Sequence, residues 1–124
     1  ICFGNALDEC IGDKKGIERY GFYYIPMDEA LARVVVDFAG RIGFSYNVNL
    51  SKADIGNIDT ELFKHFFSTV AENAKMNVHI DLIRGENTHH SLEAIFKAFA
   101  RAVAMASAPG RNPHLVPSSK GSLS

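Results

Sequence analysis

Two histidines and a carboxylate close to residue 90 are the clearest indication of chemistry in this chain. His89, His90 and Glu93 fall within five consecutive positions, and Lys97 follows four residues after the glutamate. At about 100° per residue, His89, Glu93 and Lys97 line one flank of a helix, whereas His90 points further round. Neighbouring helical side chains diverge, so the two imidazoles are badly placed to chelate one ion together and well placed to serve two. Imidazole and carboxylate ligands suit Mn, Fe, Co, Ni or Zn.

The same residues allow a plainer interpretation, because paired histidines at a helix start are often ordinary exposed side chains and short motifs match by chance. His65 poses the same choice. It lies away from the apolar stripe of its own helix, so we expect either a surface histidine or a metal ligand at a subunit interface. Four cationic residues also allow two interpretations. They are either solvated charges or a binding site for a phosphoryl group, to which Ser118 would add a hydroxyl donor. These cations are Arg19, Arg41, Lys97 and Lys120.

Three amphipathic helices are needed to position these side chains, and apolar residues at helical spacing predict each of them. The first runs to about Ile11 and ends at Gly12, and the second is capped by Asp59. The third carries the histidines and ends near Ala106. The apolar residues expected to face the core are, helix by helix, Phe3, Ala6, Leu7, Cys10 and Ile11; Leu62, Phe63, Phe66, Phe67 and Val70; and Leu92, Ile95, Phe96, Phe99 and Val103.

Alternating apolar residues predict three strands, at Leu31–Phe38, Phe44–Leu50 and Met76–Ile83. A turn at residues 39–43 separates the first two, so we expect them to form an antiparallel hairpin. The element order predicts an α+β fold, a mostly antiparallel sheet backed by two helices on one face. The opposite face would be polar, and either solvated or covered by another polar layer such as a second half-domain. Its residues are Arg33, Asp37, Asn47, His79 and Asp81.

Length, charge and cysteine content bound the class of protein. The 124 residues are 47% hydrophobic and carry a formal net charge of -1, which suits one domain with a core and argues against nucleic acid or an anionic membrane as the main partner. No apolar run is long enough to span a bilayer. Cys2 and Cys10 lie about 12 Å apart along one helix, too far for a disulfide. We therefore expect reduced core thiols in a cytoplasmic protein.

Seven stretches of the sequence together resemble one enzyme family. In chain order they are Gly12–Gly21, Pro26–Leu31, Asp37–Arg41, Asp59–Leu62, Gly85–His90, Glu93–Ala102 and Pro117–Gly121. They cover nearly the whole chain, and any one alone would be a weak signal. Taken together they are highly specific, and the chain resembles imidazoleglycerol-phosphate dehydratase, a lyase of histidine biosynthesis.

The resemblance implies a duplicated fold of two similar halves, each a four-stranded sheet backed by two helices. Residues 1–21 look like the last helix of the first half with its connecting loop, 22–108 like the second half-domain, and 109–124 like a phosphate-contacting tail. The family's first histidine-histidine-glutamate motif is absent here, and Ile1 opens in mid-helix. We therefore expect this stretch to be inactive by itself.

The resemblance also implies roles for the candidate residues. It suggests that His65, His89, His90 and Glu93 contribute to a site for two manganese ions, with Glu93 also carrying protons. The expected phosphate contacts are Arg19, Arg41, Lys97, Ser118 and Lys120. The implied reaction is loss of water from imidazole glycerol phosphate to give imidazole acetol phosphate, in a homo-oligomer of two dozen protomers.

The alternative is a non-catalytic fragment or interaction module that keeps the fold, since similar small α+β domains also bind RNA or partner proteins. The near-neutral charge and the presence of both the metal and the phosphate candidates favour the enzyme.

Overall fold

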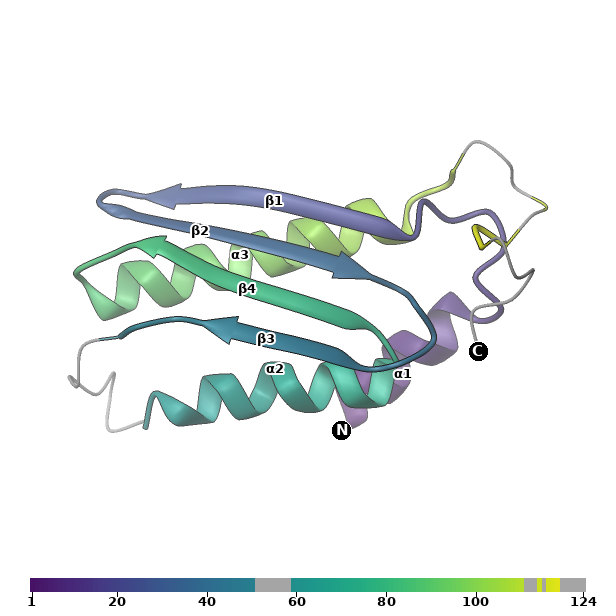
Figure 1. Cartoon of the computed structure of the whole chain (residues 1–124), viewed down its shortest axis with the longest axis horizontal. Helices are drawn as coiled ribbons and strands as arrows, with labels where there is room; N and C mark the ends of the chain where they lie inside the picture. The colour runs from purple at the N-terminus through teal and green to yellow at the C-terminus, as the bar shows by residue number, and fades with distance from the viewer. Residues whose placement is uncertain (51–58, 111–113, 115, 119–124) are drawn as a thin grey trace.

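The computed structural model describes residues 1–50, 59–110, 114 and 116–118, and its helices and strands form two layers (Figure 1). The elements are α1 (Cys2–Ile11), β1 (Tyr20–Met27), β2 (Ala30–Asp37), β3 (Gly43–Asn47), α2 (Glu61–Ala74), β4 (Asn77–Arg84) and α3 (Thr88–Ser107). The strands form one sheet, α2 and α3 cover one of its faces, and α1 packs against α2. The predicted α+β layer is confirmed. Within the described ranges, no helix is long and apolar enough to cross a membrane.

The sheet order β1-β2-β4-β3 corrects the predicted pairing of the strands. β1 and β2 pair antiparallel, as do β2 and β4, whereas β3 runs parallel to β4. The prediction that β2 and β3 form a hairpin was wrong, because β4 lies between them. The hairpin partner of β2 is β1, and the turn Asp28–Glu29 joins them. The sheet is still mostly antiparallel, as predicted.

β1 was not predicted because its sequence lacks the alternation of apolar and polar residues that marks a half-buried strand. The aromatic residues Phe22–Tyr24 follow one another, so no apolar-polar alternation marks the two faces. Gly21 is buried because α3 passes so close that a Cβ there would collide with the carbonyl oxygen of Ala102. Phe22 and Tyr24 are exposed on the open face of the sheet. That face is therefore less polar than the sequence predicted.

The core lies between the sheet and α2 and α3, and the burial pattern confirms the predicted faces of β2 and β4. On β2, every second residue from Ala30 to Val36 is buried, and Val78 and Ile80 of β4 are buried in the same way. The helices contribute large apolar side chains from α2 and a mixture of large and small ones from α3. They are Phe67, Val70, Ala71 and Ala74, and Leu92, Ala94, Ile95, Ala98, Phe99, Ala102 and Ala106.

Some residues assigned to the helix stripes lie at the surface instead. Phe3, Leu62 and Phe66 are each more than a third exposed, because α1 packs mainly on α2 and leaves the outer flank of both helices uncovered. Cys2 and Cys10 are free, as predicted, but both are exposed, so their assignment to the core was wrong. Helical spacing identifies the apolar face of each helix, but the element that packs against this face determines which of its residues are buried.

Candidate functional site

The first turn of α3 presents the two histidines, and the residue before it fixes their backbone. Asn87 is the N-cap and has an extended backbone conformation. Its side-chain oxygen accepts a hydrogen bond from the backbone N–H of His90 at 2.9 Å, which satisfies one of the free amides of the helix start. Ser91 is fully buried beneath the same turn. The helix therefore begins at Thr88 and holds His89 and His90 at a defined place on the surface.

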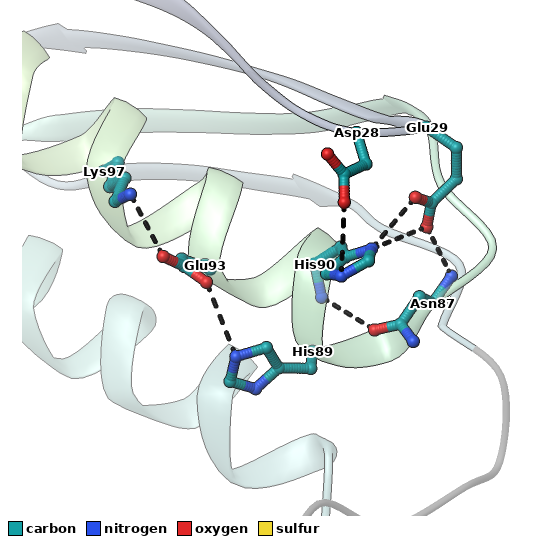
Figure 2. A network of polar contacts seen from close by, with 7 residues as sticks. All are labelled: Asp28, Glu29, Asn87, His89, His90, Glu93 and Lys97. Carbon is teal, nitrogen blue, oxygen red and sulfur yellow. Dashed lines mark hydrogen bonds and ion pairs between the residues drawn. The ribbon is translucent and has the colours of Figure 1, made fainter.

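His89, Glu93 and Lys97 form a line of contacts along one flank of α3, as the helical spacing predicted (Figure 2). Lys97 Nζ lies 3.0 Å from Glu93 Oε1, and His89 Nε2 lies 3.4 Å from Glu93 Oε2. The hydrogen bond from Lys97 is the largest influence on the carboxyl group and lowers the pKa of Glu93. Glu93 is therefore a carboxylate that bridges a cation and an imidazole.

His90 points away from this line and contacts the β1–β2 turn instead. Its Nδ1 lies 3.0 Å from Glu29 Oε2, and its Nε2 lies 3.7 Å from Asp28 Oδ2. The hydrogen bond that the His90 ring donates to Glu29 raises the pKa of His90. The backbone N–H of Asn87, followed by the His90 ring, lowers the pKa of Glu29 to about 2.

Glu93 is the one carboxylate that the sequence predicts for the site, and Asp28 and Glu29 were not predicted. These two residues are about 60 positions away from the histidines in the sequence, and only the sheet brings them together with His90. A signal was nevertheless available, because both carboxylates lie in Pro26–Leu31, one of the stretches that carried the resemblance.

The donor set fits a partial ligand shell for two separate divalent ions. Two ligand atoms bound to one ion at about 2.1 Å lie roughly 3.0–3.4 Å apart, and His89 Nε2 and Glu93 Oε2 are 3.4 Å apart. The ring centroids of His89 and His90 are 6.4 Å apart and the rings engage different carboxylates, so the predicted divergence is confirmed. Within the described part of the chain, no three potential ligand side chains are grouped around one point.

His65 is exposed on α2, as predicted, and lines a hollow between α1 and α2 together with Phe3 and Phe66. The described residues do not bring it into one cluster with His89, His90 and Glu93. Its assignment as a metal ligand stays a prediction.

Arg19 lies at the start of β1, and its guanidinium is occupied by contacts within the fold. Its Nε and Nη2 donate to the two carboxylate oxygens of Asp37 at 2.6 and 3.2 Å, and its Nη1 donates to the carbonyl of Pro117 at 2.8 Å. The guanidinium also stacks on the ring of Tyr20, 4.7 Å from the centroid. Arg19 thus ties the end of β2 to the tail that carries Ser118.

The remaining predicted phosphate contacts divide between different places. Arg41 is exposed in the connection between β2 and β3, close to the end of β2 that carries Asp37. Ser118 is half-buried beside Pro117. Lys97 belongs with Glu93. Lys120 lies outside the described residues.

The candidates therefore form two groups, one on the first half of α3 with the β1–β2 turn and the other where β1 begins and β2 ends, and these two places lie toward opposite ends of the sheet (Figure 1). We call His89, His90, Glu93 and Lys97, with Asp28 and Glu29, the histidine end, and Arg19, Asp37, Arg41, Pro117 and Ser118 the arginine end. The backbone N–H of Arg19 donates to Ala106 near the end of α3, whereas His90 is in its first turn. Sixteen residues of helix span about 24 Å. Within the described residues, His90 and Arg19 are therefore too far apart to contact the same small molecule.

Comparison with known proteins shows which family this chain is similar to. The family model described as imidazoleglycerol-phosphate dehydratase matches residues 1–103. A protein of that name from a Marinomonas species is 51% identical over 124 residues, which are 99% of this chain and 63% of that protein. One from Staphylococcus aureus is 56% identical over 121 residues, 98% of this chain and 62% of that protein.

Two solved structures are also similar. The crystal structure of the Staphylococcus aureus protein has a TM-score of 0.85 at 56% identity, over 89% of this chain and 64% of that one. The structure of the protein from Pyrococcus furiosus has a TM-score of 0.87 at 35% identity, over 99% and 66%. The chain spans about 63% of the length of its curated relatives, and with matches across nearly all of its own length it belongs to the imidazoleglycerol-phosphate dehydratase family.

Proposed function

We propose that this chain forms part of a metal-dependent hydro-lyase that removes water from imidazole glycerol phosphate to give imidazole acetol phosphate, in histidine biosynthesis. The observation that carries the proposal is the line His89–Glu93–Lys97, with His90 held separately beside it. The line combines an imidazole, a carboxylate and an ammonium group on one face of the helix, and this set of groups could serve both a metal ion and a phosphate. Family membership names the reaction, and no feature of the described residues favours a non-catalytic module.

The residues of the histidine end have distinct roles in this proposal. His89 and Glu93 would hold one manganese ion and His90 a second, with His65 as a further ligand. Bound manganese would polarise the imidazole nitrogens of the substrate and stabilise negative charge on its ring. Lys97 has three donors on its ammonium group, so it can hold Glu93 and a phosphate oxygen at the same time.

The reaction transfers protons, and the chain's own residues must carry them. The hydroxyl on the carbon beside the ring departs as water after it gains a proton, and the proton on the neighbouring carbon, which carries the second hydroxyl, leaves to a base. The resulting enol becomes the ketone by moving one proton from oxygen to carbon. Glu93, whose pKa Lys97 lowers, is ionised and can accept the carbon-bound proton.

Assembly is part of the proposal, because the two ends of one chain are too far apart to share a substrate. Imidazole glycerol phosphate is shorter than the roughly 24 Å of helix between the histidine end and the arginine end. We propose that the arginine end of one copy meets the histidine end of another, in the assembly of two dozen protomers that the resemblance implies. We also place this assembly in the cytoplasm, in keeping with the free cysteines.

A chimera tests the function directly. This chain would replace the matching stretch of the Staphylococcus aureus relative, to which it is 56% identical. We expect the chimera to form imidazole acetol phosphate when manganese is supplied, and to lose this activity when His89 is replaced by alanine. A chimera that assembles, binds manganese and converts no substrate would contradict the proposal.

A further inference from the structure

The β1–β2 turn lies beside the start of α3, and its residue Glu29 contacts two groups there (Figure 2). Glu29 Oε1 accepts from the backbone N–H of Asn87 at 2.8 Å, and Glu29 Oε2 lies 3.0 Å from His90 Nδ1. Asn87 in turn accepts from the backbone N–H of His90. Glu29, Asn87 and His90 therefore form a closed ring of contacts between a strand turn and a helix start.

We propose that Glu29 is a positioning residue that holds the His90 imidazole with its Nε2 directed toward a metal ion. This inference rests on the proposed function, because His90 is a metal ligand only there. Its basis is the geometry of the ring of contacts. Nδ1 faces both carboxylate oxygens of Glu29, at 3.0 and 3.3 Å, so the neutral ring carries its proton on Nδ1 and a lone pair on Nε2.

The opposite nitrogen of His90 is open to a ligand. The nearest charged atom to Nε2 among its described contacts is Asp28 Oδ2 at 3.7 Å, beyond hydrogen-bond distance. A histidine that donates one ring N–H to a carboxylate and offers the other nitrogen to a metal is a recurrent arrangement, in which the carboxylate sets the tautomer and the ring orientation.

The contrast with His89 supports a specific role for Glu29. His89 engages a carboxylate through Nε2, the same atom that would bind an ion, and that carboxylate is itself a proposed ligand. His90 engages Glu29 through Nδ1, so this contact persists when an ion binds Nε2.

The turn itself is built to keep Glu29 in place. Met27 and Ala30 pair across the hairpin, and Asp28 between them has a left-handed backbone with φ of 51°. Ala30 is buried. The position of Glu29 is therefore fixed by the sheet rather than by α3, and it acts on the helix from outside.

The first experiment reads the tautomer of His90 in the metal-free chain by ¹⁵N NMR, at a pH where the ring is neutral. We expect the Nδ1–H form in the native chain. In Glu29→Gln the side-chain amide can turn its NH₂ toward Nδ1, so we expect a shift toward the Nε2–H form. Glu86→Gln is the matched control, since it removes the same charge from an exposed residue beside Asn87. An unchanged tautomer in Glu29→Gln would overturn the inference, whatever the protein does with metals.

The second experiment measures manganese affinity of the chimera by the electron paramagnetic resonance signal of free Mn²⁺. We expect the ion held by His90 to bind about 10–100-fold more weakly in Glu29→Gln and Glu29→Asp, with little change in Glu86→Gln. Failure of the native chimera to bind manganese would contradict the proposed function. Native binding that Glu29→Gln leaves intact would contradict only the positioning role. Thermal melts of all variants confirm that each one is folded.

Discussion

The histidine end and the arginine end differ in how far their side chains are committed to the fold. At the arginine end, the side chains of Arg19 and Asp37 are only 14% and 21% exposed and hold each other through two hydrogen bonds. At the histidine end, the side chains of His89 and Lys97 are 68% and 56% exposed, and each forms an ion pair with Glu93. Charged residues that look like ligand contacts in the sequence can therefore have two different roles. His89 and Lys97 are exposed and available to a ligand, whereas Arg19 and Asp37 stabilise the fold that carries the site.

The largest effect should come from the carboxylate at the centre of the histidine end. Glu93→Gln in the chimera removes both a proposed proton carrier and a metal ligand, so we expect the turnover number to fall by about 10²–10⁴-fold. The exposed helix surface should tolerate the change, with an unfolding free energy within about 0.5 kcal/mol of the native value. Steady-state kinetics and urea unfolding measure the two quantities. Native turnover in this variant would remove Glu93 from the chemistry.

The next effect concerns the exposed cations at both ends. Lys97→Ala and Arg41→Ala each lose a proposed charge-assisted contact with the substrate phosphate, worth about 1.5–3 kcal/mol. The phosphate is bound alike in the ground and transition states, so KM should rise roughly 10-fold or more while the turnover number changes little. Substrate saturation curves of both variants test this. Unchanged KM values would show that the phosphate is held elsewhere.

In contrast to Lys97 and Arg41, Arg19 should contribute mainly to the stability of the fold. Arg19→Met breaks the pair with Asp37 and frees the tail at Pro117, so we expect a loss of about 2 kcal/mol in the free energy of unfolding. Lys97→Met, the matched change at the exposed pair, should cost less than about 0.5 kcal/mol. Urea denaturation of the two variants decides the comparison. Equal losses would show that the two ends do not differ as described.

The smallest effect is expected at a position that belongs to neither end. The hydroxyl of Tyr46 on β3 is buried without a hydrogen-bond partner in the described structure, and burial raises the pKa of Tyr46 to about 12. Tyr46→Phe should raise the unfolding free energy by about 1 kcal/mol at neutral pH.

The raised pKa of Tyr46 also determines how the stability of the native chain should depend on pH. The folded chain keeps the phenol neutral, while the unfolded chain ionises it near its ordinary pKa of about 10. Native stability should therefore decline as pH rises from about 10 toward 12, and Tyr46→Phe should lack this part of the decline. Chemical unfolding across that pH range gives the measurement, and an identical pH dependence in both proteins would count against a buried phenol.

Local periodicity predicted those features that depend on one element. The buried faces of β2 and β4 and the divergence of His89 from His90 were predicted correctly because strand and helix geometry alone sets them. The pairing of β2 was predicted wrongly because a strand's neighbour depends on the whole chain, and because β1 was not recognised as a strand, so β3 was taken as the partner.

The contacts of the candidate site show the same difference between local and long-range features. The contacts of Glu93 with His89 and Lys97 follow from spacing on α3. The contacts of Glu29 with His90 and of Asp37 with Arg19 join residues 61 and 18 positions apart, and no helical or strand period relates them. The metal and phosphate roles stay predictions, since they depend on ions and on further copies of the chain.

The length of α3 is itself under constraint, because this one helix separates the two ends. Adding a single residue between Lys97 and Ala106 would turn the histidines by about 100° relative to the sheet and move them about 1.5 Å away from the β1–β2 turn. Adding a full turn would restore their direction but displace them by about 5.4 Å, out of reach of Glu29. Insertions and deletions in evolution should therefore accumulate in the connections between elements and spare this helix.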